Sequence, residues 1–158
     1  MTVFLLSAFM ALSISFFCSL MEACLLSLSQ ADIARMMKQR PLAARIWRSF
    51  KANIQRPIAV ILIINTLAHT IGAAVSGAEF NRLFGSKWIA VYSLVFSLIM
   101  IQWTEILPKS LGVRYNRKLA SAMAVPLNGL VLLFRPLVYA VEVVNRPFNA
   151  GKSAHAAE

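Results

Sequence analysis

Three long apolar stretches, separated by polar segments, make up most of the first 107 residues of the chain. They cover residues 2–28, 57–77 and 88–107, and each is long enough to cross the roughly 30 Å hydrocarbon core of a bilayer as a helix. Glu22 is the only charged residue in the first stretch, and Glu105 is the only one in the third. The first stretch is too long for a secretory signal and has no basic start. The pattern predicts three membrane-spanning helices.

The following segment, residues 119–144, is apolar but interrupted by proline, glycine and arginine. Because each uninterrupted piece is too short to span a bilayer, we expect two short helices over about 119–146 that lie at the membrane interface or are partly re-entrant. A fourth spanning helix is the alternative. Residues 149–158 are small and polar, which is typical of a disordered tail.

Composition supports a membrane protein. Hydrophobic residues make up 59% of the 158 residues and charged residues 14%, whereas soluble domains have roughly 45–50% and about 25%. The mean hydropathy is +0.68. The two cysteines, Cys18 and Cys24, lie about 9 Å apart along one helix, beyond disulfide reach. The fold class is therefore an all-α integral membrane protein in one domain, with the lipid bilayer as its surroundings.

The net charge of +10 is concentrated in two segments. Seven basic residues lie in 29–56 and four in 108–118, whereas the polar loop at 78–87 has two basic residues and one acidic residue. By the positive-inside rule, the N-terminus faces outside and the C-terminus the cytoplasm, in the cell membrane. Since the basic residues follow the ends of apolar stretches, nucleic-acid binding is not expected.

Polar residues in the first stretch share one face of the predicted helix. Ser15, Ser19, Glu22 and Ser29 fall within about 80° of one another at 100° per residue. A carboxylate inside a membrane span is costly and marks a functional site by default. The alternative is that Glu22 reaches water at the helix end or pairs with a lysine.

The second stretch has a similar stripe, in which Asn65, His69, Gly72 and Ser76 fall within about 60° of one another. Gly72 and Ser76 form a small-xxx-small pair that permits close helix contact. This stripe is equally well explained as a plain helix–helix contact with interhelical hydrogen bonds.

The third stretch places Gln102 and Glu105 on one side, shortly before Pro108. Pro108 cannot donate to the carbonyl of Thr104, and a freed carbonyl beside a carboxylate is either a cation ligand or a helix end. Together the three helices offer hard oxygen donors, which suit Mg²⁺, Ca²⁺ or Na⁺. No recognisable catalytic motif is present, so we do not expect an enzyme.

Three segments match motifs of a known family, in order and with matching spacing. They are SLMEACLLSLS at 19–29, INTLAH at 64–69 and EILPKS at 105–110. They resemble the first-, second- and third-helix motifs of the transmembrane domain of the CNNM/CorC family of magnesium transporters, over roughly residues 1–148. The third motif, Glu-Ile-x-Pro-Lys, is the most specific.

The resemblance implies a homodimer with three spanning helices per subunit and a belt of short helices on the cytoplasmic side. It implies Mg²⁺ as the transported ion, exported with Na⁺ as the coupling ion. The ion site that it implies uses Ser19, Asn65 and Glu105, with Glu22 as a neighbour and His69 at the position of a second asparagine. The competing interpretations are a non-transporting sensor or assembly scaffold, and a transporter for another divalent metal.

Two positions depart from the family pattern. His69 replaces an asparagine and would repel a divalent cation when protonated, and Thr104 stands where a glycine often precedes the glutamate. Family members usually continue into nucleotide-binding CBS modules. None is expected in residues 1–158, so no nucleotide is expected to bind this chain, which is either a piece of a longer protein or a short member.

Overall fold

The computed structural model describes residues 1–140 of the chain. Throughout this part the secondary structure is helical, without strands, which confirms the predicted all-α class. The remainder of the predicted 119–146 segment and the predicted tail at 149–158 lie outside the described residues. The α-helices are α1 (Thr2–Ser27), α2 (Gln30–Gln39), α3 (Pro41–Ala52), α4 (Gln55–Phe84), α5 (Ile89–Met100), α6 (Leu107–Arg114) and α7 (Asn116–Leu133), with a 3₁₀ helix η1 (Ser86–Trp88) and a π-helix η2 (Ile101–Ile106).

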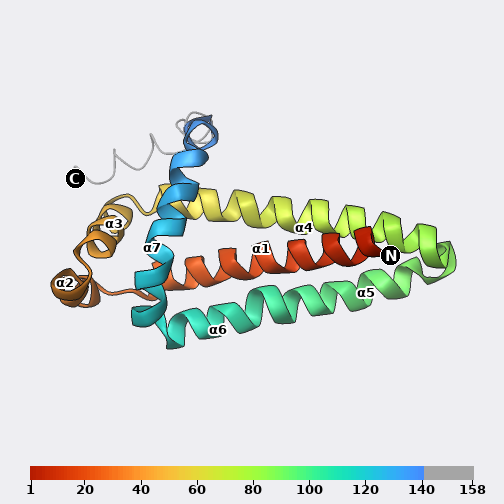
Figure 1. Cartoon of the computed structure of the whole chain (residues 1–158), viewed down its shortest axis with the longest axis horizontal. Coiled ribbons are helices and arrows are strands. Elements are labelled where there is room, and N and C mark those ends of the chain that lie inside the picture. The colour runs from red at the N-terminus through yellow and green to blue at the C-terminus, as the bar shows by residue number, and fades with distance from the viewer. Residues whose placement is uncertain (141–158) are drawn as a thin grey trace, which may run out of the picture.

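Three long rods lie side by side in the structure (Figure 1). They are α1, α4 and the continuous rod formed by α5, η2 and α6, and α1 contacts both of the others. Among the described residues, these three are the helices long and apolar enough to cross a membrane. The prediction of three spanning helices is thus confirmed in number.

The second and third rods are longer than their apolar stretches. The second continues past residue 77 to Phe84, and the chain turns only at Gly85, whose φ of +79° favours glycine. The third continues past residue 107 to Arg114, because Pro108 stands in the first turn of α6, where a missing N–H costs little. A helix ends where the backbone must turn rather than where its residues become polar.

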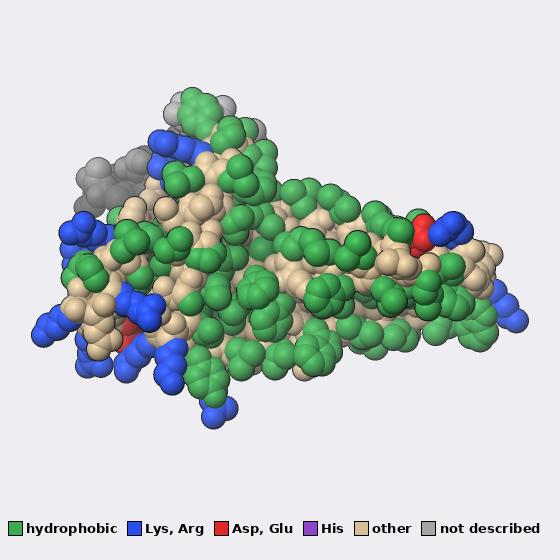
Figure 2. Space-filling model, in the orientation of Figure 1, with side chains coloured by type: hydrophobic (Ala, Val, Ile, Leu, Met, Phe, Trp, Pro, Cys, Tyr) green, Lys and Arg blue, Asp and Glu red, His purple; other side chains and the backbone are tan. Residues whose placement is uncertain are grey.

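The sides of the rods are covered with exposed apolar side chains (Figure 2). Leu5, Phe9, Leu62, Leu94 and Leu98 are each more than half exposed. In water this surface would be a severe aggregation hazard, whereas lipid chains solvate it. Most of the basic side chains gather at one end of the molecule, called here the basic end, where α2, α3 and α7 lie (Figures 1 and 2).

The basic end has the best-packed apolar core. Trp47 of α3 is fully buried, and its indole Nε1 donates to the carbonyl of Ala120 at 2.8 Å. The buried face of α7 is formed by Ala120, Ala124 and Leu127, whose spacing of four and three residues is that of one helix face. This core also contains Cys18 and Cys24, both free.

The segment after α6 forms two helices as far as it is described, in agreement with the expectation: α7 ends at Leu133, and after a turn at Phe134 the chain is helical again over 135–140. α7 crosses the ends of the rods instead of running parallel to them (Figure 1). Pro126 lies inside α7 and removes one backbone hydrogen bond, but the buried stripe continues across it from Ala124 to Leu127.

Two glycines bring α1 into close contact with its neighbours. A β-carbon on Gly72 of α4 would lie 2.1 Å from Cβ of Ala11, and one on Gly112 of α6 would lie 2.5 Å from Cβ of Ala23. Ser76 is also fully buried. The small residues Gly72 and Ser76 are therefore used inside the chain, and they do not indicate a contact between subunits.

Ser29 does not belong to the polar stripe of the first helix, because α1 ends at Ser27. Its hydroxyl instead accepts from the backbone N–H of Asp32 at 3.1 Å, as the N-cap of α2. The guanidinium of Arg117 pairs with the Asp32 carboxylate at 2.7 Å. This pair connects α2 to the start of α7.

The contact at Gly72 leads to a stability prediction. Gly72→Ala forces α4 away from Ala11, and we expect a lower midpoint of thermal unfolding in detergent, in line with about 1–3 kcal/mol for overpacking. Gly129→Ala is the matched control, since a β-carbon there meets nothing within 4 Å and alanine favours a helix. Equal midpoints for the two variants would show that α1 and α4 are not in close contact.

Candidate functional site

Polar side chains from α1, α4 and η2 meet between the three rods. The Ser15 hydroxyl donates to Oδ1 of Asn65 at 2.5 Å, and Nδ2 of Asn65 donates to Oε1 of Glu105 at 3.3 Å. Ser15 is fully buried. The predicted stripes of the first two helices therefore face each other, and the third helix contributes its carboxylate to the same cluster.

His69 lies one turn from Asn65, on the side away from the basic end. Its Nε2 contacts the hydroxyls of Ser15 and, at 3.2 Å, Thr104. The Ser15 proton points to Asn65, and the Thr104 proton points to the carbonyl of Met100 at 2.7 Å. The Nε2 atom of His69 thus connects Ser15 of α1 to Thr104 of η2.

Lys109 lies on the other side of the cluster, toward the basic end. Its ammonium is 2.9 Å from Oε2 of Glu105 and 3.4 Å from Oε2 of Glu22. The lysine side chain is 44% exposed and each glutamate 31%. Pairing with a lysine was the alternative interpretation of Glu22, and this is what the structure contains. Two carboxylates share one ammonium.

Ser19 is the exception in this well-connected cluster. It is fully buried between Ser15 and Glu22 on the α1 stripe, and within the described residues its hydroxyl has no hydrogen-bond partner. A buried polar group without a partner costs about 1–3 kcal/mol, and such groups are rare enough to need an explanation. A bound cation or water would provide the missing contact.

The π-helix η2 sets the position of Glu105. In this wider turn the N–H of Leu107 donates to the carbonyl of Gln102, five residues earlier, and Pro108 has no N–H to continue the α-helical pattern. Thr104 is fully buried, whereas Gln102 is exposed. Gln102 therefore does not join Glu105 in the cluster, contrary to the expectation that both lie on one functional side.

The donor set indicates which ions suit the cluster. Residues 1–140 contain no group of three His, Cys, Asp or Glu side chains arranged as a metal site. A cation here would instead combine one or two carboxylates with the neutral oxygens of Ser19 and Asn65, and with backbone carbonyls. This set favours hard cations such as Mg²⁺ over soft metals.

Sequence reasoning identified Ser19, Glu22, Asn65, His69 and Glu105 but not the contacts that connect them. It assigned no role to the Thr104 side chain and did not pair Lys109 with Glu105. The signal for Lys109 was its spacing of four residues from Glu105, which brings two side chains together on a helix. No comparable sequence signal indicated that Thr104 contacts His69.

The two serines of the stripe give a paired prediction for protein kept free of divalent cations. Ser15→Ala leaves Asn65 and His69 without their shared partner, so it should lower the midpoint of thermal unfolding, at a cost of about 1–3 kcal/mol. Ser19→Ala removes a hydroxyl that has no partner and should leave the midpoint unchanged or raise it. Destabilisation of similar size in both variants would indicate that Ser19 is hydrogen-bonded in the protein.

Comparison with known proteins identifies the family to which the chain belongs. The family model of the cyclin M transmembrane N-terminal domain matches residues 6–157. A UPF0053 protein of Synechocystis is 31% identical over 135 residues, which are 85% of this chain and 39% of that protein. The UPF0053 inner membrane protein YfjD of Escherichia coli is 26% identical over 125 residues, 79% of this chain and 29% of its own length.

A chloroplastic DUF21 domain-containing protein of Arabidopsis thaliana is 23% identical over 126 residues, 80% of this chain and 19% of that protein. The chain thus spans well under half the length of these relatives. With the match over nearly its whole length and with three helices suited to a bilayer, the chain is a membrane protein that belongs to the cyclin M (CNNM) transmembrane-domain family.

Proposed function

We propose that this chain forms the ion-conducting membrane part of a divalent cation transporter, with Mg²⁺ as its substrate. One observation carries the proposal. The buried hydroxyl of Ser19, which has no partner within the described residues, lies on α1 between Ser15, which bonds to Asn65, and Glu22, one of two carboxylates that share a single ammonium. This cluster has oxygen donors and negative charge available for a cation.

In this proposal Glu105 is the principal ligand. Mg²⁺ needs about six oxygens near 2.1 Å, and Glu105 adds a full negative charge to the neutral oxygens of Ser19 and Asn65. Asn65 already lies within hydrogen-bond distance of Glu105. Backbone carbonyls of η2 and water would complete the shell. His69 is a positioning residue here, because its Nε2 holds the Ser15 and Thr104 hydroxyls.

Lys109 acts in this proposal as a tethered counter-charge. Without a cation, its ammonium offsets one of the two negative charges of Glu105 and Glu22 and reduces their mutual repulsion inside a membrane segment. When Mg²⁺ binds Glu105, the ammonium moves away toward the basic end, where its partly exposed side chain has access to water. Cation binding therefore competes with an internal salt bridge, which weakens binding and favours release of the ion.

The charge pattern supports one orientation of the chain in the membrane. We propose that the basic end is cytoplasmic and the N-terminus outside, since most of the basic residues lie at that end. Lys109 and Glu22 then form the cytoplasmic side of the cluster, and Mg²⁺ enters from the cytoplasm for export coupled to Na⁺. The working unit is a homodimer, and the chain is not an enzyme.

The function is tested by measuring Mg²⁺ efflux from proteoliposomes with and without an opposing Na⁺ gradient. We expect flux that increases with the gradient. Flux without Na⁺ dependence would contradict the coupling but not the transport. Binding without flux would favour a sensor or scaffold, and flux only of another metal would contradict Mg²⁺ as the substrate.

The ligand role of Glu105 is tested by Glu105→Gln. Glutamine keeps the size and the hydrogen bond from Asn65 but removes the charge, so we expect the variant to fold and to lose most Mg²⁺ binding, as measured by titration calorimetry. Glu79→Gln is the control, since it removes a carboxylate that pairs with Arg82 at the other end of α4. Parent-like binding by Glu105→Gln would place the ion site elsewhere.

The counter-charge role of Lys109 gives an opposite prediction. Lys109→Met keeps the length of the side chain but frees both carboxylates, so Mg²⁺ should bind several-fold more tightly in the same calorimetric titration. Lys87→Met, at the end opposite the basic end, is the charge-matched control. Weaker binding by Lys109→Met would contradict competition between the ammonium and the ion.

A further inference from the structure

A second feature of interest is a cavity of about 480 Å³ at the basic end, between α2 and the start of α7. It is lined by Asp32, Arg35, Met36, Gln39, Arg40, Arg117, Lys118 and Ser121. None of these residues belongs to the cation cluster. The cavity is strongly basic, because four cationic side chains line it and one carboxylate does.

The carboxylate of Asp32 is already engaged. It accepts from the Ser29 hydroxyl at 2.6 Å and pairs with Arg117 at 2.7 Å. These contacts, with the Ser29 hydroxyl as the largest cause, hold the pKa of Asp32 below its usual value, so the carboxylate stays ionised at neutral pH. Arg35, Arg40 and Lys118 form no ion pair within residues 1–140. Their positive charge is uncompensated.

The depth of the cavity relative to the bilayer can be read from the end of the third rod. Val113 is 58% exposed and apolar, and Tyr115, just past the end of α6, is 44% exposed. Arg114 and Tyr115 line an adjoining cavity of about 360 Å³, which also includes Arg117 and Lys118. Lipid-facing residues thus give way to basic residues within one helical turn. Tyrosine and arginine are typical of the level of the headgroups.

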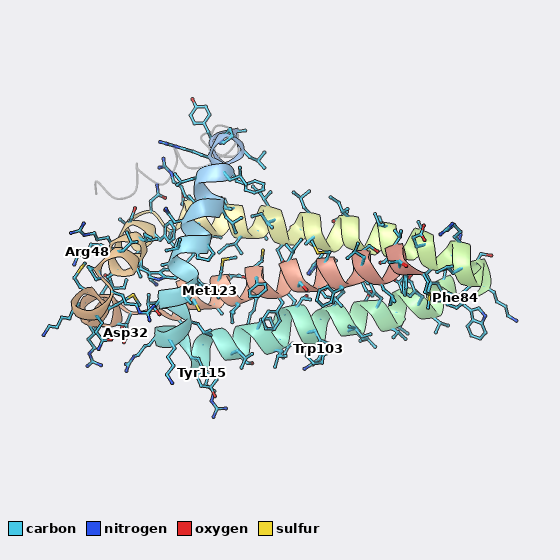
Figure 3. The ribbon with its side chains drawn as sticks, viewed as in Figure 1. Asp32, Arg48, Phe84, Trp103, Tyr115 and Met123 are labelled. Atoms are coloured by element: carbon cyan, nitrogen blue, oxygen red, sulfur yellow. The ribbon has the colours of Figure 1, made fainter. Side chains whose placement is uncertain are left out.

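We propose that this cavity binds the phosphate of an anionic phospholipid. Arg35, Arg40 and Lys118 would contact the phosphate oxygens, and the acyl chains would run along the exposed apolar side of α6 at Val113. A soluble phosphate compound would meet the same charges but would leave that apolar surface uncovered. Figure 3 shows Asp32 and Tyr115 near each other at the basic end, far from Phe84 at the opposite end.

Bound lipid would hold α2 against α7. The two helices are connected across this cavity by the pair of Asp32 and Arg117. A bound phosphate would contact Arg35 of α2, Arg40 at the end of α2 and Lys118 of α7 at the same time, and would so add a second connection. Lipid binding here is separate from cation binding, because no residue is shared between the two sites.

The test is native mass spectrometry of the purified chain with phosphatidylglycerol, and with phosphatidylcholine of the same acyl chains. We expect preferential retention of phosphatidylglycerol. The double variant Arg35→Gln, Lys118→Gln should weaken that retention by roughly ten- to thirtyfold, as expected for the loss of two basic residues near a lipid surface. Arg117 is left in place because it pairs with Asp32.

The control is the double variant Arg45→Gln, Arg48→Gln. It removes the same charge from exposed positions on α3 at the same end of the molecule, where Figure 3 shows Arg48. Equal losses in both variants would overturn a specific site, and so would equal retention of the two lipids by the parent chain. Displacement of phosphatidylglycerol by inorganic phosphate at low millimolar concentration would overturn the role of the acyl chains.

Discussion

The close approach of α1 to its two neighbours is the constraint on which the rest of the structure depends. It rests on two residues without side chains, Gly72 against Ala11 and Gly112 against Ala23. These contacts lie at either end of the polar stripe of α1. Between them, Ser15 and Glu22 come within reach of groups on the other two rods.

The two parts of the molecule are stabilised in different ways. At the basic end a packed core around Trp47 excludes water, as in a soluble domain. Along the rods, apolar side chains point outward to lipid, and the contacts between rods include small residues, hydrogen bonds and the aromatic rings of Phe4, Phe80 and Tyr92. Removal of apolar surface from water therefore cannot hold the rods together. Polar contacts such as Ser15 with Asn65 contribute to both the packing and the proposed function.

The sequence was sufficient to predict the number of long helices and the residues on their polar faces, because both follow from local periodicity. It also predicted Asn65 and Glu105 as site residues, since their motifs resemble those of a known family. It could not predict that Ser15 and Thr104 meet at His69, which depends on how each helix is rotated about its axis. Pro126 was misleading for a related reason, because tertiary packing of α7 outweighs the local cost of proline.

The π-helix makes the structure sensitive to the number of residues in the segment 101–106. Its wider turn contains about one residue more than an α-helical turn. Since each residue of an α-helix corresponds to about 100° of rotation, the side chains of α6 are rotated by about 100° about the helix axis relative to a continuous α-helix from α5. Deleting a single residue from 101–106 would restore an ordinary α-helix and rotate the whole of α6 about its axis. Gly112 would then no longer face Ala23, and Lys109 would turn away from Glu22. The spacing of this short segment, more than the identity of most of its residues, should therefore be what evolution preserves.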